Sequence, residues 1–437
     1  MKNKKRLLKV LIIIVAFIAI MLLIGKAYAE IIDKDGIKRA AADEKTMIKN
    51  CVLKVAGESS NNTITAENLK TQLNRYLGSN KVKVEENTSA KTIDITYIAS
   101  DRTYTVKTDT LEIAGDDSGG TTTEGTYLPA KFTQVAGTTL ENGLTIQDST
   151  GNQYVWVEVP KTTTVYPTAG LDITSFTDEE YTKIEKDLQT YTNDYRETGY
   201  KDEYYSDEVT GLTSAQYTEL KRKMLKSIYQ NGGFYVGKYE TGIESTPKTS
   251  GSETTAPTET PVIKQNAYPY NNVTCSQAQT LASSMESGNY TSSLMFGVQW
   301  NLVLKYLETE GTLQSELKSD STNWGNYYNS LWDITNASSK YTYSYSNWVS
   351  GAYGAKTSSE EILLSTGASD SFSKQGIYDL AGNVLEWTLE YSSFSSGPCV
   401  YRGGNYYRYG TYGSANTCFY TYTTDYGYNL GFRVALF

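Results

Sequence analysis

The last strand-like segment of the chain carries a charge where apolar residues are expected. Arg433 stands between Phe432 and Val434 in a segment that is otherwise typical of a buried closing strand. A guanidinium buried there needs a carboxylate partner, because an isolated buried charge is too costly. Glu386 and Asp379 are the candidate partners, and the sequence leaves the choice between them open. The fold is therefore expected to bring the segment that holds these two carboxylates against the C-terminal strand.

Three short motifs occur in order around these residues. They are D-x-x-G-N-x-x-E-W at 379–387, Arg-Gly-Gly at 402–404 and Gly-Phe-Arg-Val-Ala at 431–435. Together they resemble the signature of the formylglycine-generating enzyme family, also called sulfatase-modifying-factor proteins. Weaker similarity upstream extends the resemblance over roughly residues 127–437. It implies an α+β domain with the C-type-lectin-like fold and sparse secondary structure.

The N-terminus has the composition of a membrane segment. Basic residues precede an apolar run from Val10 to Ile24. Counted from Leu7, this run approaches the roughly 20 residues that span a bilayer, and the preceding charges favour an extracellular C-terminus. Residues 1–29 are therefore predicted to be a signal anchor of a single-pass protein on the bacterial cell surface. Ala27-Tyr28-Ala29 also fits a signal-peptidase site, so cleavage after Ala29 would make it a secreted protein.

Residues 30–113 show the patterns of a small α/β unit. Helices are predicted at 37–55 and at 66–77, the second with Thr65 as N-cap. Alternating strand patterns follow at 81–84, 92–97 and 103–106. A membrane helix that leads into such a unit resembles a type IV pilin, but the prepilin cleavage pattern is missing, so a stalk domain is preferred. Residues 114–126 are predicted to be a flexible linker.

The rest of the chain, residues 127–437, mixes strand and helix patterns. Strands are predicted at 144–146, 154–159 and 234–239. Helices are predicted at 178–191, 215–229, 275–285 and 296–307, the first three with Thr177, Ser214 and Thr274 as N-caps. Residues 309–375 are polar and are expected to be irregular.

The composition excludes several classes of function. The chain has no histidine, which removes histidine bases, Ser-His-Asp catalysis and metal sites with histidine ligands. Its net charge of −9 argues against a nucleic-acid partner, which requires clustered cations.

The resemblance to the formylglycine-generating enzymes also implies a copper ion held by two cysteines after the Arg-Gly-Gly motif. The matching positions here are Arg408 and Gly413, which cannot supply the thiolates that copper(I) prefers. The chain is therefore predicted not to be an enzyme and to require no cofactor. Cys399 and Cys418 flank these positions, and a disulfide between them and two separate thiols both fit the spacing. An unusual cysteine oxidase that uses Cys418 is the enzymatic alternative.

A calcium site is a further expectation from the resemblance. Two carboxylates with free carbonyls on a glycine-containing turn suit a hard cation. The family's ligands carry over to Asp379, Gly382, Val384 and Glu386. A hydrogen-bonded turn without metal is the alternative.

The segment 405–428 has an unusual composition. It reads NYYRYGTYGSANTCFYTYTTDYGY, about a third of it Tyr. Rigid aromatic side chains among small polar ones are typical of binding surfaces, and so many Tyr hydroxyls are hard to bury, although a packed, structural Tyr segment is the alternative. Lys, Glu, Gln, Met and Trp are absent, and every residue type present has a codon that ends in a pyrimidine. The segment resembles the variable segment of proteins diversified by a diversity-generating retroelement.

These observations predict a surface-displayed receptor or adhesin of the retroelement-diversified type. Its partner would be an extracellular ligand, by hypothesis a protein, and it would meet the membrane through its N-terminal helix. A minor pilin-like structural subunit is the remaining alternative. The predicted ligand contacts are Asn405, Tyr406, Tyr407, Arg408, Tyr409, Tyr412, Asn416, Phe419, Tyr420, Tyr422, Asp425, Tyr426 and Tyr428.

Overall fold

The computed structural model describes most of the chain. The described residues are 48, 51–52, 54–56, 64–77, 81–97, 102–109, 111, 113–115, 126–129, 131–247, 257–285, 290–343, 347–394 and 397–437. The chain divides into two compact units, one that ends at Tyr127 and one that runs from Leu128 to Phe437. The predicted signal anchor 1–29, the helix start 37–47 and most of the linker 114–126 lie outside the described residues. None of the described helices is both long and apolar enough to span a membrane.

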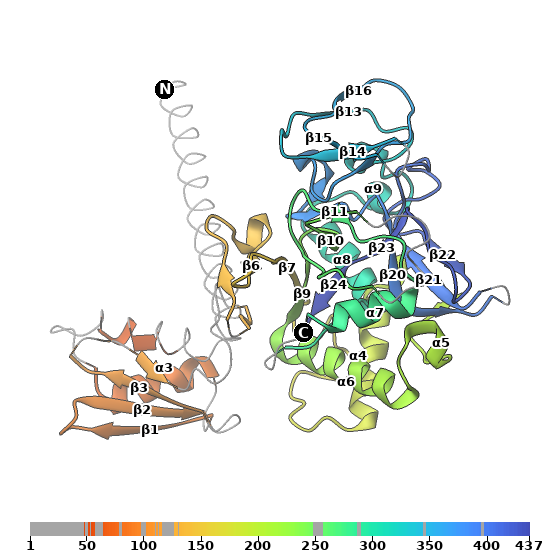
Figure 1. The fold of residues 1–437 in the computed structure, drawn as a ribbon. Helices are drawn as coiled ribbons and strands as arrows, with labels where there is room; N and C mark the ends of the chain where they lie inside the picture. Colours follow the sequence, from red (N-terminus) through yellow and green to blue (C-terminus); the bar gives the residue numbers. More distant parts are fainter. Residues whose placement is uncertain are drawn as a thin grey trace, which may run out of the picture. The chain divides into compact units, whose positions relative to one another are not determined.

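The first unit packs a helix on a four-stranded antiparallel sheet (Figure 1). Leu69 and Leu73 lie four residues apart in the helix, so both face the core. In β2 Ile93 and Ile95 alternate with polar residues and are buried on the same side. The elements are α3 (Ala66–Leu77), β1 (Val82–Asn87), β2 (Thr92–Tyr97), β3 (Arg102–Lys107) and β4 (Ile113–Gly115).

These elements confirm the predicted helix and strands of this unit. Thr65 is the N-cap of α3, since its hydroxyl accepts a hydrogen bond from the Asn68 backbone N–H at 3.3 Å. The sheet extends further than expected, because β4 pairs with β3 and takes up the first residues of the predicted linker.

Two sheets organise the second unit. The larger has six strands in the order β12-β24-β9-β7-β6-β5, and the other joins β22-β21-β20-β23, with β8 paired to β20. Their strands are β5 (Thr133–Gln134), β6 (Thr145–Gln147), β7 (Gln153–Glu158), β8 (Tyr200–Lys201), β9 (Gly233–Gly237), β12 (Ser292–Leu294), β20 (Leu385–Ser392), β21 (Cys399–Arg402), β22 (Cys418–Thr421), β23 (Leu430–Phe432) and β24 (Val434–Leu436). The predicted strands at 144–146, 154–159 and 234–239 correspond to β6, β7 and β9.

The closing strand is split between the two sheets. β23 runs parallel to β20 in one sheet, and β24 pairs antiparallel with β9 and β12 in the other. Arg433 stands at the change of sheet with a fully buried side chain. Its Nη2 lies 2.7 Å from Glu386 Oε1, and it also donates to the backbone oxygens of Gly237 and Tyr378. Glu386 is therefore the ion-pair partner that the sequence left open.

Helices pack around these sheets. They are α4 (Asp178–Tyr191), α5 (Asp207–Thr210), α6 (Ser214–Asn231), α7 (Cys275–Ser283), α8 (Gly297–Thr309) and α9 (Gln314–Lys318). Thr177 and Thr274 cap α4 and α7 as predicted. The predicted cap at Ser214 is wrong: Thr213 is the N-cap of α6, because its hydroxyl accepts from the Gln216 backbone N–H. Gly232, with φ 73°, ends that helix in the left-handed conformation that glycine adopts at little cost.

The remaining elements are short. They are β10 (Gly242–Ile243), β11 (Tyr268–Pro269), β13 (Trp332–Ile334), β14 (Lys340–Thr342), β15 (Val349–Ser350), β16 (Gly354–Lys356), β17 (Leu363–Leu364), β18 (Ser373–Lys374), β19 (Ile377–Tyr378) and the 3₁₀ turns η1 (Leu140–Asn142), η2 (Asn193–Tyr195), η3 (Thr322–Trp324) and η4 (Asp370–Phe372). The region 309–375 is as irregular as its composition predicts, apart from α9 and strands of two or three residues.

Candidate functional site

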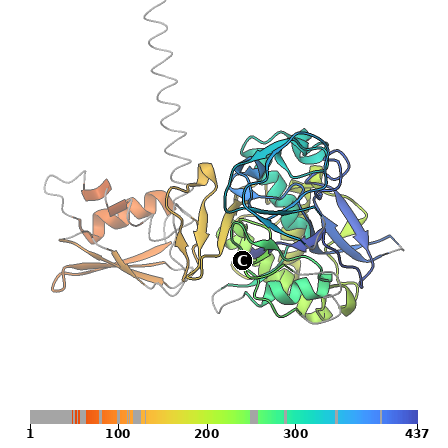
Figure 2. The same cartoon turned by 45° about the horizontal axis from the view of Figure 1, so that its top comes forward.

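The Tyr-rich segment leaves the end of β21, returns as β22 and reaches β23 through a turn. β21 and β22 form an antiparallel pair in which Tyr401 lies opposite Phe419. In both views the blue β21–β22 pair lies at the edge of the second unit (Figures 1 and 2). The segment is therefore carried on a regular sheet edge but consists mostly of loop.

Part of this segment belongs to the interior. Asn405, Tyr406 and Asn416 were predicted as ligand contacts, yet they are 0%, 1% and 7% exposed. Tyr406 packs with Leu363 and Val384 in a small hydrophobic cluster. A ligand at the surface does not reach these three side chains, so their assignment as ligand contacts is corrected to a structural one.

Hydrogen bonds from the rest of the domain hold the backbone of the segment. The Tyr406 N–H donates to Asn383 O at 3.0 Å, and Arg408 O accepts from the Tyr328 N–H at 2.9 Å. The indole N–H of Trp300, in α8, donates to Ala415 O at 3.0 Å. The loop between β21 and β22 is therefore held in place by residues outside the segment.

On this framework, half-buried and exposed aromatic side chains form two groups, which the adjacent residues Arg408 and Tyr409 join. The Arg408 guanidinium lies 4.7 Å from the centre of the Phe419 ring, whose centre is 5.7 Å from that of Tyr401. The ring of Tyr409 is 6.1 Å from Tyr412 and 5.4 Å from Tyr328. We call this set the Tyr401 face: Tyr328, Tyr401, Arg408, Tyr409, Tyr412 and Phe419.

Other predicted contacts lie elsewhere. Tyr420 follows Phe419 in β22 and therefore points to the opposite side of the sheet, where it stacks on Phe394 with ring centres 5.1 Å apart. Tyr407 and Tyr428 are half-buried and pack against the Tyr406 cluster. The predicted residues thus do not form a single surface.

The turn after β22 supplies the last of the predicted contacts. Tyr422 and Tyr426 are exposed, at 59% and 43%. Asp425 is half-buried and accepts a short hydrogen bond from the Thr421 hydroxyl.

Sequence reasoning missed two members of the Tyr401 face. Tyr328 and Tyr401 lie outside 405–428, in an irregular region and in a strand. The pairing of Tyr401 with Phe419 would have needed the register of β21 and β22, which no local pattern shows. Tyr328 is brought in by the hydrogen bond of its N–H to Arg408 O and by the contact of its ring with Tyr409.

Arg408 and Gly413, the positions predicted to correspond to the family's copper ligands, both lie in this segment. Arg408 stacks on Phe419, and a side chain at Gly413 would approach Gly404 Cα to 3.2 Å. The thiol nearest in sequence, that of Cys418, is 7% exposed and donates to Asn416 O at 3.8 Å. Burial raises the pKa of Cys418 well above its ordinary value, which disfavours the thiolate needed for copper.

A disulfide between Cys399 and Cys418 is ruled out by the strand register. Cys399 lies opposite Thr421, whereas Cys418 lies opposite Arg402. Three residues of strand, roughly 10 Å, separate the two cysteines along the sheet, and a disulfide requires Cα atoms within about 7 Å. All four cysteines of the chain are free thiols.

The residues proposed for calcium do not fit together as ligands. Both carboxylate oxygens of Glu386 are within 3.1 Å of Arg433 Nε, so the guanidinium already supplies the positive charge beside this carboxylate. Asp379 is buried and accepts from the Gly367 N–H at 2.6 Å. No cluster of carboxylates or thiols suited to a metal occurs among the residues that the structure describes. In this structure the motif around 379–387 is a buried hydrogen-bonded turn, and the calcium site stays a prediction.

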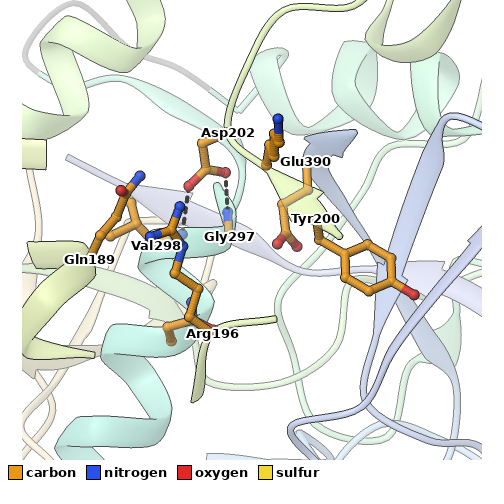
Figure 3. Close-up of a pocket in the computed structure, with 9 residues that line it drawn as sticks. Gln189, Arg196, Tyr200, Asp202, Gly297, Val298 and Glu390 are labelled. Atoms are coloured by element: carbon orange, nitrogen blue, oxygen red, sulfur yellow. Dashed lines mark hydrogen bonds between the residues drawn. The ribbon is translucent and has the colours of Figure 1, made fainter. Parts of the chain in front are cut away.

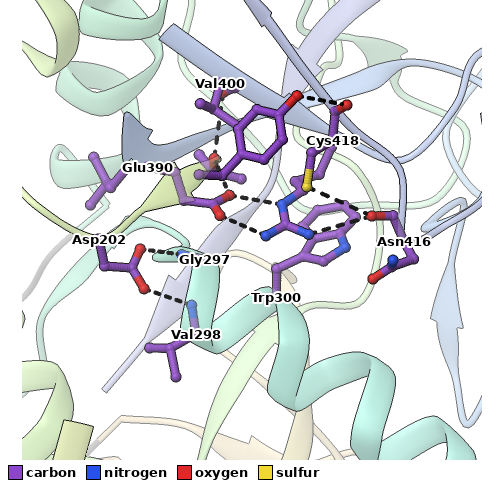
Figure 4. A network of polar contacts seen from close by, with 12 residues as sticks. Asp202, Gly297, Val298, Trp300, Glu390, Val400, Asn416 and Cys418 are labelled. Carbon is purple, nitrogen blue, oxygen red and sulfur yellow. Dashed lines mark hydrogen bonds and ion pairs between the residues drawn. The ribbon is translucent and has the colours of Figure 1, made fainter. Parts of the chain in front are cut away.

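A second buried ion pair lies under the Tyr-rich segment (Figure 4). Arg402, from the Arg-Gly-Gly motif, donates to both oxygens of Glu390, at 2.6 and 2.8 Å. Its third contact is with Asn416 O at 3.4 Å, inside the segment. Arg402 thus links strand β20 to the interior half of the loop.

A small pocket borders this network (Figure 3). Asp202 lies in it and accepts from the backbone N–H groups of Gly297 and Val298, at 2.6 and 2.8 Å, at the N-terminus of α8. The cavity measures about 10 Å³, room for no more than about one water molecule. It is a structural polar site and is too small to be a substrate pocket.

Asp202 makes the stability of the protein depend on pH. Burial, and then the charge of Glu390, raise its pKa from 3.8 to about 7. The folded state therefore binds this proton more tightly, so the stabilisation is complete below pH 3.8 and is lost as the pH rises through 7. We expect the free energy of unfolding to fall by about 2–3 kcal/mol between pH 5 and pH 8 in denaturant titrations.

Two variants test whether Asp202 causes this fall in the free energy of unfolding with rising pH. Asp202→Asn should reduce the pH dependence but not abolish it, because burial also raises the pKa of Asp379 to about 7, and the exposed Glu219→Gln should leave it unchanged. A free energy of unfolding that is constant or rises from pH 5 to pH 8 in the native sequence contradicts the assignment.

Comparisons with known proteins agree with the motifs. The sulfatase-modifying factor enzyme 1-like domain matches residues 135–436, which confirms the resemblance drawn from the sequence. No curated protein matches the chain.

Among solved structures, Treponema denticola variable protein 1 is 15% identical and has a TM-score of 0.26, covering 47% of this chain and 84% of that chain. The I1 and M1 variants of the Major Tropism Determinant are each 9% identical, with TM-scores of 0.22 and 0.21, over 81% of this chain and 85% of theirs. Scores this low carry no argument about fold or function.

Proposed function

Because this chain belongs to the sulfatase-modifying factor enzyme 1-like family, we propose that it is a member of that family that binds a ligand instead of catalysing a reaction. In this proposal the domain has the C-type-lectin-like fold and presents the Tyr401 face to an extracellular partner, by hypothesis a protein. The chain is displayed on the bacterial surface by its N-terminal segment. In the same proposal, the chain is the variable protein of a diversity-generating retroelement.

The proposal is based on one observation: part of the Tyr-rich segment is buried and holds the backbone in place, and another part exposes aromatic side chains. Tyr406, Ala415 and Asn416 are buried and hold the backbone, whereas Tyr409 and Tyr412 are 46% and 72% exposed. Exposed Tyr residues beside a guanidinium provide large contact area and hydrogen-bonding groups at low entropy cost. Changes at these exposed positions leave the scaffold intact, which is what a diversified binding surface requires.

The absence of catalysis rests on the residues at the family's reactive positions. Arg408 and Gly413 offer no sulfur ligand, and burial holds Cys418 in its thiol form. The chain also has no histidine that could take their place as a nitrogen ligand. Binding to the Tyr401 face is the function that remains.

The proposal is tested by sequencing this gene and its flanks in many clonal isolates. We expect substitutions to concentrate at the exposed Tyr409 and Tyr412 and at the half-buried Arg408 and Phe419. Buried positions of the same segment, such as Tyr406 and Ala415, should stay constant, because substitutions there disrupt packing. The substitutions should coincide with adenines of a near-copy template repeat.

The neighbouring strands provide the control. Codons of β20 and β24 should vary no more than the rest of the domain. If the exposed and buried codons of 405–428 are equally constant across isolates, the protein has a fixed partner and the retroelement assignment is rejected. Substitutions that do not coincide with template adenines reject it as well.

A further inference from the structure

Two buried thiols from distant parts of the chain meet beside the sheet that carries the Tyr-rich segment. Cys275 is the first residue of α7 and Cys399 the first of β21, and both are at most 1% exposed. The Cys275 thiol donates to Thr388 O, in β20, at 3.6 Å. Thr388 lies opposite Val400, the chain neighbour of Cys399. The Cys399 thiol donates to Val209 O at 3.8 Å, in α5, which packs against α7.

The two sulfurs also interact directly. The neighbouring Cys399 thiol, together with burial, raises the pKa of Cys275 well above that of a free thiol. A disulfide joins two thiols whose sulfurs approach to about 2.05 Å, so neighbouring buried thiols on α7 and β21 are candidates for one. Cys418 is excluded as a partner of Cys399 by the register of β21 and β22, and Cys51 belongs to the other compact unit.

We propose that Cys275 and Cys399 form a disulfide bond when the chain folds in oxidising surroundings. Each thiol gives up its proton and a sulfur–sulfur bond forms. The two electrons reduce the disulfide of the oxidant, a thiol oxidoreductase or oxidised glutathione, to two thiols. Because both sulfurs are sealed in the folded core, the exchange takes place before the core closes.

The bond would brace the scaffold of the proposed binding face. It closes a loop of about 120 residues, and cross-links across long loops restrict the unfolded chain most. It also ties α7 to the β20–β21 pair, the strands from which the Tyr-rich segment departs. The disulfide then stabilises the strands that carry the Tyr-rich segment, while the exposed residues of that segment vary. The disulfide depends on the two thiols alone and is independent of the proposed ligand binding.

The test uses the full-length protein, purified in detergent after refolding with oxidised glutathione. The protein is denatured with iodoacetamide but without reductant, digested and examined by mass spectrometry. We expect one cross-linked pair of peptides that contains Cys275 and Cys399, with Cys418 and Cys51 alkylated. Reduction should lower the Tm of the oxidised protein by roughly 5 °C or more.

Three variants separate the cross-link from a general effect of reductant. Cys275→Ala and Cys399→Ala should each lose the cross-linked pair and the response of Tm to reductant. Cys418→Ala should keep both, and it is the matched control because this thiol is also buried. Alkylation of all four cysteines after oxidative refolding, or a cross-link between any other pair, overturns the proposal.

Discussion

Replacement of Arg433 by methionine is expected to lower the free energy of unfolding by about 3–5 kcal/mol. The substitution leaves the Glu386 carboxylate buried without its partner, where it is 1% exposed. It also removes the hydrogen bonds to Gly237 O and Tyr378 O. Those contacts join the two sheets at the point where the chain passes from one to the other. The loss is measured by urea denaturation of the variant beside the native protein.

A double variant shows whether the loss comes from the ion pair. Arg433→Met with Glu386→Met removes both charges, so it should cost clearly less than the sum of the two single substitutions. Lys183→Met provides the surface control, since its ion pair with Glu179 is exposed and its removal should have no measurable effect on stability. A loss below about 1 kcal/mol for Arg433→Met would falsify the structural role of this pair.

Replacement of Gly404 by alanine is expected to be the most damaging small change near the Tyr-rich segment. A Cβ at this position would lie 2.0 Å from Gly413 O and 2.4 Å from the Tyr327 ring. Backbone on one side and a buried ring on the other leave no room to adjust, so we expect a loss of about 3 kcal/mol. Urea denaturation gives this loss, and limited proteolysis should show new cleavage between β21 and β22.

Neighbouring substitutions provide a graded comparison. In Gly413→Ala the closest atom would be Gly404 Cα at 3.2 Å, so a loss of about 1 kcal/mol is expected. Thr411→Ala removes an exposed side chain and should have no measurable effect. Equal stability of the Gly404 and Thr411 variants would mean that the loop does not need close contact at this position.

The sequence predicted the local elements of this protein well, because their signals are short in range. The capping patterns at Thr177 and Thr274 marked helix starts that the structure has at those residues. Ser214 shows the limit of such signals. Two adjacent hydroxyl residues both fit a cap, and only the hydrogen bond to the Gln216 N–H identifies Thr213.

The candidate site was predicted less completely than the elements. Composition located the segment 405–428 but did not distinguish its buried residues from its exposed ones. Asn405 and Asn416 have the same residue type as surface amides, yet the fold buries them. Tyr406 and Tyr412 differ only in what the rest of the chain places beside them.

The sequence by itself determined the family, the helix and strand patterns and the need for a carboxylate beside Arg433. These follow from short motifs, from periodicity and from the cost of a buried charge. Only the tertiary structure decided that Glu386 is that partner, that Cys399 lies beside Cys275, and that Tyr328 and Tyr401 belong to the Tyr401 face. Each of these depends on strand register and on contacts between residues far apart in the chain, which no local pattern encodes.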